Sequence, residues 1–470
     1  MGKALNRHIL KALGIFGGSQ AISIVCSFVR NKFAALLLGT QGVGLLAIFN
    51  NAIDLLTNTT QLSIRQSAVR DVAKAESKEA LGRIAFIVMR WAWILGVIGA
   101  FITIAASPWI SQYSFGSDEY VPHICILSAV IFIAAIQTGW QIIIQGVNDM
   151  AALAKSQVWG SVIGAVVSIP MYYFWGLASI LPSLLTYSVA TAIATACYRK
   201  RFPKPSPTPS QTEILREGIS FIKLGFYMTA SAFATLFATY IYIGWLSSTA
   251  SVSEVGLFNA GNTIINRYAT LVFAAIGYEY YPRLSRVIDN TTEVRDHVCS
   301  EINITLLVIL PMICIYLAFN DFFITLLYSS DFTPIVPFMK WAMLGIVLKA
   351  ISWCMAFTIL ARGEGRDYIF TEVASSIVYL LSHVYFYKYF GIIGWGYAFL
   401  TWYAAYIAII AYFYFFKYHF TITKTTIYLS LAVTAIALLA TLLTSISQIA
   451  VLALAVVVSI ATLLYIKKIA

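Results

Sequence analysis

Residues 19–30 read Ser-Gln-Ala-Ile-Ser-Ile-Val-Cys-Ser-Phe-Val-Arg, and residues 231–242 read Ser-Ala-Phe-Ala-Thr-Leu-Phe-Ala-Thr-Tyr-Ile-Tyr. Both stretches place polar residues at steps of four, four and three, and they lie 212 residues apart. Residues three and four apart share one face of a helix, so each stretch predicts an apolar helix with a hydrophilic stripe. The same offset relates Val43-Gly44-Leu45 to Val255-Gly256-Leu257 and Asn50 to Asn262. The sequence therefore predicts a duplicated helical bundle.

The composition is that of a membrane protein. Hydrophobic residues occupy 60% of the 470 positions, charged residues occupy 11%, and the mean hydropathy is +0.81. These values exclude an ordinary soluble globule. A stretch of about 20 apolar residues crosses a hydrocarbon core of about 30 Å. We predict an all-α polytopic membrane protein with 14 transmembrane helices, at 12–37, 44–64, 84–106, 122–146, 156–176, 179–198, 221–247, 255–280, 302–319, 337–360, 369–389, 392–416, 425–446 and 449–466.

Basic residues predict the orientation of these helices. If the N-terminus lies in the cytoplasm, most of the 31 lysine and arginine residues fall in cytoplasmic loops, as the positive-inside rule requires. The opposite loops are acidic and contain Asp118, Glu119, Glu254, Asp321 and Asp331. An even number of spans then places both termini in the cytoplasm. The net charge of +11 follows from this topology, and nucleic acid is not an expected partner.

The duplication divides the chain into two predicted lobes. An N-lobe at 1–200 and a C-lobe at 218–420 each contain six helices, and residues 201–217 form a cytoplasmic Pro-rich linker. Alternating prolines between 203 and 209 are typical of a stiff, extended linker. Residues 421–470 add two C-terminal helices that have no counterpart in the duplication. Parallel repeats around a central polar path are typical of transporters, so we expect a central cavity.

The helix at 44–64 carries the longest polar stripe. Asn50, Asp54, Thr57, Gln61 and Arg65 recur at steps of four, three, four and four. The stripe either lines a cavity or forms hydrogen bonds that hold the helices together. Asp54 is the deep carboxylate of this stripe, and its depth lies within about 5 Å of that of Arg30. It is either an ion-coupling site or a static counter-charge for Arg30.

Amide side chains form two further stripes. One contains Gln137, Gln141 and Gln145, and the other contains Asn262 and Asn266. Amides donate and accept hydrogen bonds at once, which suits the hydroxyl groups of a neutral sugar. The alternative is again helix-to-helix hydrogen bonding.

Three cations lie too deep in their predicted helices to reach the membrane surface easily. They are Arg30, Arg267 and Lys349, and such residues line aqueous paths or bind anions. Glu372 lies at a cytoplasmic helix end, where we expect water to solvate it.

Other motifs indicate no catalysis. The glycines Gly39, Gly42 and Gly44 fail the dinucleotide-binding spacing and predict a tight turn or hinge. The six cysteines are scattered and predict neither a zinc site nor a disulfide framework. We therefore expect no metal, no cofactor and no enzyme activity.

Several motifs resemble one transporter family. They are Arg30-Asn-Lys-Phe-Ala-Ala-Leu-Leu-Leu-Gly-Thr-Gln-Gly-Val-Gly, Ser67-Ala-Val-Arg-Asp-Val-Ala, Gln145-Gly-Val-Asn-Asp, Val255-Gly-Leu-Phe-Asn-Ala-Gly and Tyr281-Pro-Arg-Leu-Ser-Arg. In order and spacing they resemble polysaccharide-transport proteins, the Wzx-type O-antigen translocases of the multidrug, oligosaccharidyl-lipid and polysaccharide exporter superfamily.

The resemblance implies a function and its partners. Such a protein would flip an undecaprenyl-pyrophosphate-linked oligosaccharide from the cytoplasmic to the periplasmic leaflet of the bacterial cytoplasmic membrane, by alternating access coupled to H⁺ or Na⁺. Membrane lipid and other membrane proteins of glycan assembly would be further partners. The pyrophosphate would be bound by Arg30, Arg267 and Lys349. The glycan would be bound by Asn50, Gln61, Gln137, Gln141 and Asn262. Asp54 would be the ion-coupling residue.

Three alternatives stay open. Fourteen helices, rather than the usual twelve of O-antigen flippases, also resemble the lipid II flippase. A multidrug antiporter of the same superfamily would need an acidic cavity, whereas Arg30 makes the first helix basic. A glycan polymerase or ligase would need a large external loop, and the longest one here runs from about 107 to 121.

Overall fold

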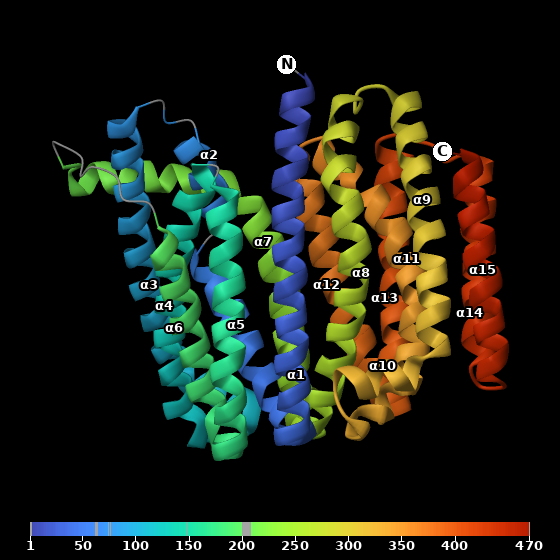
Figure 1. The fold of residues 1–470 in the computed structure, drawn as a ribbon, viewed down its shortest axis with the longest axis horizontal. Coiled ribbons are helices and arrows are strands. Elements are labelled where there is room, and N and C mark those ends of the chain that lie inside the picture. The colour runs from blue at the N-terminus through green and yellow to red at the C-terminus, as the bar shows by residue number, and fades with distance from the viewer. Residues whose placement is uncertain are drawn as a thin grey trace. The chain divides into compact units, whose positions relative to one another are not determined.

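The computed structural model describes residues 2–61, 64–73, 75, 77–147, 149–199 and 208–469. Within these residues, side chains are described except at 2–21, 66, 67, 70, 150, 220–228, 267–272, 274–279, 281, 282 and 465–469. This part of the chain is helical, with short connections (Figure 1). The helices are α1 (Gly2–Gln61), α2 (Ile64–Ala73), α3 (Lys78–Phe115), η1 (Asp118–Tyr120), α4 (Val121–Gly146), α5 (Met150–Trp175), η2 (Gly176–Ser179), α6 (Ile180–Tyr198), α7 (Gln211–Thr249), α8 (Val252–Arg286), α9 (Thr291–Ala318), α10 (Asn320–Leu327), η3 (Ser330–Ile335), α11 (Val336–Ala361), α12 (Gly365–Phe390), η4 (Gly391–Ile393), α13 (Gly394–Ala411), η5 (Tyr412–Lys417), α14 (Lys424–Leu443) and α15 (Gln448–Ile469).

Each predicted apolar stretch falls on a helix. Over the described residues, nine helical segments are long and apolar enough to cross a membrane. Three of these segments, Ile22–Gln61, Ala151–Tyr198 and Gly365–Lys417, each overlap two of the predicted stretches. The all-α, multi-pass membrane fold is therefore confirmed, and the number of fourteen spans stays a prediction.

The predicted turn between the first two apolar stretches lies at Gly39. Its backbone is non-helical, with φ of 65° and ψ of −167°, and it produces a kink within α1. A residue with a Cβ rarely adopts this positive φ, whereas glycine does so without steric cost. Gly39 therefore separates the two apolar halves of α1.

Two glycines related by the duplication make a close helix crossing. A Cβ added to Gly44 of α1 would lie 1.8 Å from the carbonyl oxygen of Val252, at the start of α8. A Cβ added to Gly256 would lie 2.1 Å from the carbonyl oxygen of Thr40. Thr40 and Val252 are separated by the same 212 residues as the two glycines. Small residues allow such close backbone approach, so the repeated sequence motif forms a symmetric crossing.

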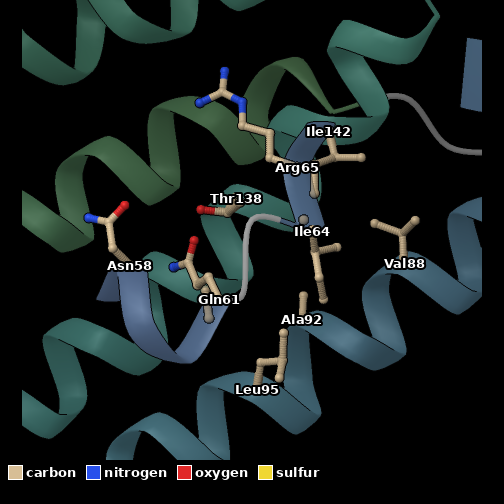
Figure 2. A pocket seen from close by; sticks show the side chains of 11 residues that line it. Asn58, Gln61, Ile64, Arg65, Val88, Ala92, Leu95, Thr138 and Ile142 are labelled. Carbon is tan, nitrogen blue, oxygen red and sulfur yellow. The ribbon is translucent and has the colours of Figure 1, made fainter. Parts of the chain in front are cut away.

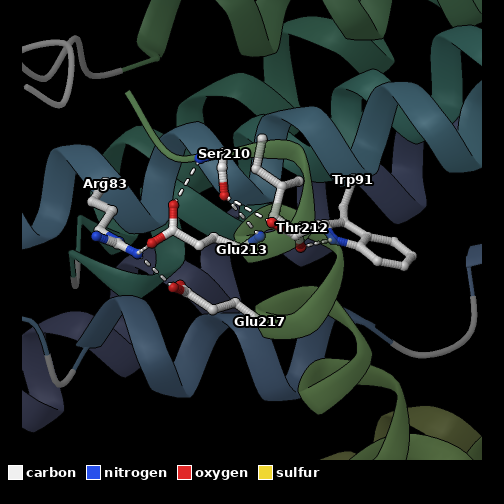
Figure 3. A network of polar contacts seen from close by, with 7 residues as sticks. Arg83, Trp91, Ser210, Thr212, Glu213 and Glu217 are labelled. Atoms are coloured by element: carbon white, nitrogen blue, oxygen red, sulfur yellow. Dashed lines mark hydrogen bonds and ion pairs between the residues drawn. The ribbon is translucent and has the colours of Figure 1, made fainter. Parts of the chain in front are cut away.

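The N-terminal turns of α7 are bound to α3 (Figure 3). Ser210 caps α7, accepting from the Glu213 N–H while the Glu213 carboxylate accepts from the Ser210 N–H. Arg83 of α3 forms an ion pair with Glu217 at 2.8 Å, and the Trp91 indole donates to a backbone carbonyl of α7 at 2.7 Å. Residues 211–217, which the sequence assigns to the linker, are therefore helical. Residues 201–207 of the predicted linker lie outside the described part.

The chain packs as two compact units, Met1–Gly256 (unit 1) and Leu257–Ala470 (unit 2). Unit 1 contains α1 to α7 and the first residues of α8, and unit 2 contains the remaining helices. A buried apolar cluster in unit 1 joins α2, α3, α4 and the start of α7, and includes Ile64, Val88, Trp91, Ile142 and Ile214. This cluster fixes the position of α2 against α4, which matters for the cavity beside it.

Candidate functional site

A cavity of about 260 Å³ lies inside unit 1, beside the end of α1. Its walls come from α1, α2, α3 and α4, and they consist of Asn58, Gln61, Ile64, Arg65, Val88, Ala92, Leu95, Ala135, Thr138, Gly139 and Ile142. Figure 2 shows the polar groups of Asn58, Gln61, Thr138 and Arg65 on one side, with the apolar side chains of α3 on the other. The cavity therefore has one polar wall and one apolar wall.

The cation of the polar wall is Arg65, the second residue of α2. Its Nε and Nη2 atoms donate to the Oε1 atom of Gln145, at 3.3 and 3.2 Å. Gln145 is neutral, and within the described part of the chain no carboxylate forms an ion pair with Arg65. The guanidinium therefore keeps a net positive charge and further N–H donors beside the cavity. This arrangement suits an anionic oxygen ligand.

The amides and the hydroxyl of the polar wall supply neutral hydrogen-bonding groups. The Nε2 atom of Gln61 is buried and has no hydrogen-bond partner among the described residues. Asn58 donates from Nδ2 to the carbonyl oxygen of Asp54 at 2.8 Å, which leaves its own Oδ1 as an acceptor. Thr138 donates to the Ala134 carbonyl at 2.9 Å and can still accept. A buried donor such as the Gln61 Nε2 atom usually has a hydrogen-bond partner, so this atom, together with the acceptors of Asn58 and Thr138, can bind a polar ligand.

The predicted residues of α1 lie apart from one another. The guanidinium carbon of Arg30 lies over the ring of Tyr187 of α6, 4.5 Å from its centroid. Asp54 is exposed, and no ion pair between the described Arg30 and Asp54 side chains is present. Asn50 is partly buried on α1. The Arg30 charge is therefore held by an aromatic face rather than by this carboxylate.

The two predicted glutamines of α4 differ in their contacts. Gln137 donates from Nε2 to the Thr195 hydroxyl at 3.4 Å and accepts from the Thr191 hydroxyl at 3.3 Å. It thus joins α4 to α6, as the helix-bonding alternative proposed. Gln141 is partly buried on the same helix, one turn from Gln145.

In unit 2, a chain of hydrogen bonds brings two of the predicted residues together. The Nζ atom of Lys349 on α11 donates to the Oδ1 atom of Asn266 on α8 at 3.3 Å. Asn266 in turn donates to the Oδ1 atom of Asn262 at 3.0 Å. The Lys349 ammonium lies 5.5 Å from the centroid of the Tyr403 ring. Arg267 belongs to α8, and its side chain lies outside the described residues.

Two polar positions differ from the sequence expectations. Arg65 belongs to the predicted stripe of the 44–64 helix but is not among the residues assigned to substrate binding, and in the structure it lies on α2, after α1 has ended at Gln61. Glu372 was expected to be solvated, but it is partly buried and accepts a hydrogen bond from Tyr406 of α13 at 2.8 Å. The tyrosine partner is distant in sequence, so periodicity gave no signal of it.

Sequence comparison connects this chain to glycan-related proteins. A family model described as polysaccharide biosynthesis protein matches residues 33–337, which is more than half of the chain. The lipid III flippase of Escherichia coli (strain K12) is 25% identical over 408 residues, covering 83% of this chain and 94% of that protein. The lipid III flippase of Shigella flexneri matches with the same values.

Structure comparison connects the fold to membrane transporters. The lipid II flippase MurJ in its inward closed conformation has a TM-score of 0.73 at 13% identity, covering 97% of this chain and 99% of that one. A multidrug resistance MATE family transporter of the MOP superfamily, inward-facing, has a TM-score of 0.68 at 15% identity, covering 88% and 95%. At these identities the likeness shows a shared fold alone.

Proposed function

The chain belongs to the polysaccharide biosynthesis protein family, and we propose that it flips an undecaprenyl-pyrophosphate-linked oligosaccharide from the cytoplasmic to the periplasmic leaflet of a bacterial cytoplasmic membrane. The family, the lipid III flippases that this chain resembles and the transporter fold indicate a transporter rather than an enzyme. The lipid-linked glycan is the substrate class that these similarities favour.

The polar cavity of unit 1 is the observation that carries this proposal. Arg65 is exposed at the start of α2, no described carboxylate forms an ion pair with it, and its side chain lines the cavity, so its positive charge is accessible to an anionic ligand there. Guanidinium groups bind phosphate oxygens in a bidentate manner, and the amides beside Arg65 suit sugar hydroxyls. With a volume of about 260 Å³, the cavity has room for one phosphate or one sugar unit, with the rest of the oligosaccharide outside it.

The residues named from the sequence are proposed to bind the substrate, each set within its own unit: Arg30, Asn50, Gln61, Gln137 and Gln141 in unit 1, and Asn262, Arg267 and Lys349 in unit 2. Arg30, Arg267 and Lys349 would bind the pyrophosphate. Within the described part of the chain, two of them contact neutral groups only: the Arg30 guanidinium lies over the Tyr187 ring, and the Lys349 ammonium donates to the Asn266 amide. The glycan would contact the amides of Asn50, Gln61, Gln141 and Asn262. Gln137 would join them only after leaving its two threonine partners.

Ion coupling is proposed for Asp54. The carboxylate lies one helical turn from Asn58, which lines the cavity, and its backbone carbonyl already accepts from that amide. Binding of H⁺ or Na⁺ would neutralise the negative charge of Asp54, which lies near the cavity proposed to bind the phosphate. Such a charge change favours one conformation only if the ion binds the two states with different affinity.

Depletion of the protein in its own cell tests the proposal. We expect one lipid-linked glycan to accumulate on the cytoplasmic leaflet, detected by mass spectrometry and by its inaccessibility to an external glycan-modifying enzyme. Plasmid-borne parent should restore export, whereas Arg65→Ala at equal membrane abundance should restore it poorly. Accumulation of lipid II would assign a different substrate. Loss of drug export with unchanged glycan lipids would contradict the proposed function.

A further inference from the structure

A second, almost entirely apolar groove of about 470 Å³ lies on the surface of unit 1. Its walls come from α3, α4 and α6, and every lining residue except Arg199 is apolar or aromatic. Trp93 of α3 packs edge-on against Phe132 of α4, with 5.0 Å between the ring centroids, and both rings line the groove. The groove shares no residue with the cavity of Arg65.

The length of the groove matches one leaflet of a membrane. On α6 it runs from Val189 through Ile193 and Ala196 to Arg199. Ten residues separate the first from the last, which at a rise of about 1.5 Å per residue is about 15 Å. Half of a hydrocarbon core is also about 15 Å. A hydrocarbon chain from one leaflet would therefore fill the groove along its length.

Arg199 places a positive charge where that chain would meet its headgroup. It is the exposed residue that immediately follows the last residue of α6. Its guanidinium carbon lies 5.5 Å from the ring centroid of Trp140, which also lines the groove. Within the described part of the chain no carboxylate forms an ion pair with it. Arg199 lies at the end of the groove because α6 ends at Tyr198, and the cation–π contact with Trp140 of α4 holds the guanidinium against the groove.

We propose that this groove binds one anionic glycerophospholipid of the surrounding leaflet. An acyl chain lies against α3, α4 and α6, and the phosphate is bound by Arg199. The charge at the end of the apolar wall is complementary to an anionic headgroup and gives no advantage to a zwitterionic one. An undecaprenyl chain is longer than the groove and would extend beyond Val189. The inference does not depend on which substrate is transported.

Photo-crosslinking of the full-length protein in vesicles tests this site. Two lipids with the same diazirine acyl chain are compared, one with a phosphatidylglycerol and one with a phosphatidylcholine headgroup, and labelled peptides are identified by mass spectrometry. We expect groove peptides of α4 and α6 to prefer the anionic lipid about fivefold, which corresponds to the about 1 kcal/mol of one basic residue near an anionic surface. Arg199→Gln should abolish the preference, and Arg199→Lys should retain most of it.

Two controls keep the result specific. Arg216→Gln removes one exposed positive charge of α7 outside the groove and should leave the preference unchanged. Ala196→Trp narrows the groove and should lower labelling by both lipids. Equal labelling by the two headgroups in the parent, or an unchanged preference in Arg199→Gln, would overturn the proposal. Displacement of the anionic probe by equimolar undecaprenyl phosphate would also overturn it, because the occupant would then be a prenyl lipid.

Discussion

The arginines of unit 1 differ in the groups that contact their positive charge. Arg83 faces two carboxylates at a helix start, whereas Arg65 is held by the neutral amide of Gln145 and Arg30 by the ring of Tyr187. A charge balanced by carboxylates stabilises local structure. A charge held only by an amide or a ring remains able to attract an anion. The two latter arginines are therefore the positions at which substitution separates ligand binding from folding.

We predict that Arg65→Ala weakens substrate binding with little loss of stability. A hydrogen bond to a charged group contributes about 1.5–3 kcal/mol, so the apparent affinity for the lipid-linked glycan should fall roughly 10- to 100-fold. Arg65→Lys should recover part of it, because lysine keeps the charge but loses the planar pair of donors. Concentration dependence of flipping in proteoliposomes measures this, with Arg216→Ala as the control. An unchanged half-saturation concentration would remove Arg65 from the site.

We also predict that Asp54→Asn uncouples flipping from the ion gradient. The amide imitates the ion-neutralised carboxylate, so the variant should bind substrate but respond weakly to an imposed H⁺ or Na⁺ gradient. Flipping rates with and without the gradient, in the same vesicles, give the measurement. Gradient dependence equal to that of the parent would show that Asp54 has only a structural role.

The elements meet most closely where the duplicated motif crosses itself. Gly44 and Gly256 approach the backbones at Val252 and Thr40, and no side chain fits between them. Such crossings rely on close van der Waals contact, because apolar helices gain little hydrophobic free energy from association within lipid. The close approach of α1 and the start of α8 thus depends on glycine, which has no Cβ, at positions 44 and 256.

We predict that Gly44→Ala and Gly256→Ala each destabilise unit 1. Because a Cβ would fall within 2.1 Å of a carbonyl oxygen, the helices must separate, and overpacking typically costs about 1–3 kcal/mol. Thermal unfolding in detergent, monitored by aggregation, should show a lower midpoint for both variants. Gln41→Ala, on an exposed position of the same helix, is the matched control. Midpoints equal to that of the parent would contradict the crossing.

At the scale of the whole molecule, the charge distribution predicts the side on which each connection lies. The segment between α6 and α7 contains the basic sequence Arg199-Lys-Arg, and the α3–α4 connection contains Asp118 and Glu119. The positive-inside rule therefore places Thr208 in the cytoplasm and Asp118 on the opposite side. Both residues are exposed, so their accessibility can be measured.

We predict that Thr208→Cys, in a chain without its six native cysteines, reacts with an impermeant maleimide only after the membrane is opened. Asp118→Cys should react in sealed spheroplasts. Gel shift of the labelled protein is the readout. Labelling of Thr208→Cys in sealed spheroplasts would reverse the topology and the predicted cytoplasmic position of both termini.

The sequence by itself determined the all-α membrane fold, a turn or hinge among Gly39, Gly42 and Gly44, and the repeated register, because hydrophobic periodicity and glycine conformation are local properties of a chain; the structure places the turn at Gly39. It also placed Gln61 and Arg65, four residues apart, in one polar stripe. Only the tertiary structure decided the partners. It joined Arg65 to Gln145 across 80 positions, Gln137 to Thr191 and Thr195, and Glu372 to Tyr406. A helix face specifies which side chains point together, but its neighbour depends on packing between helices distant in the chain, and periodicity carries no information about that.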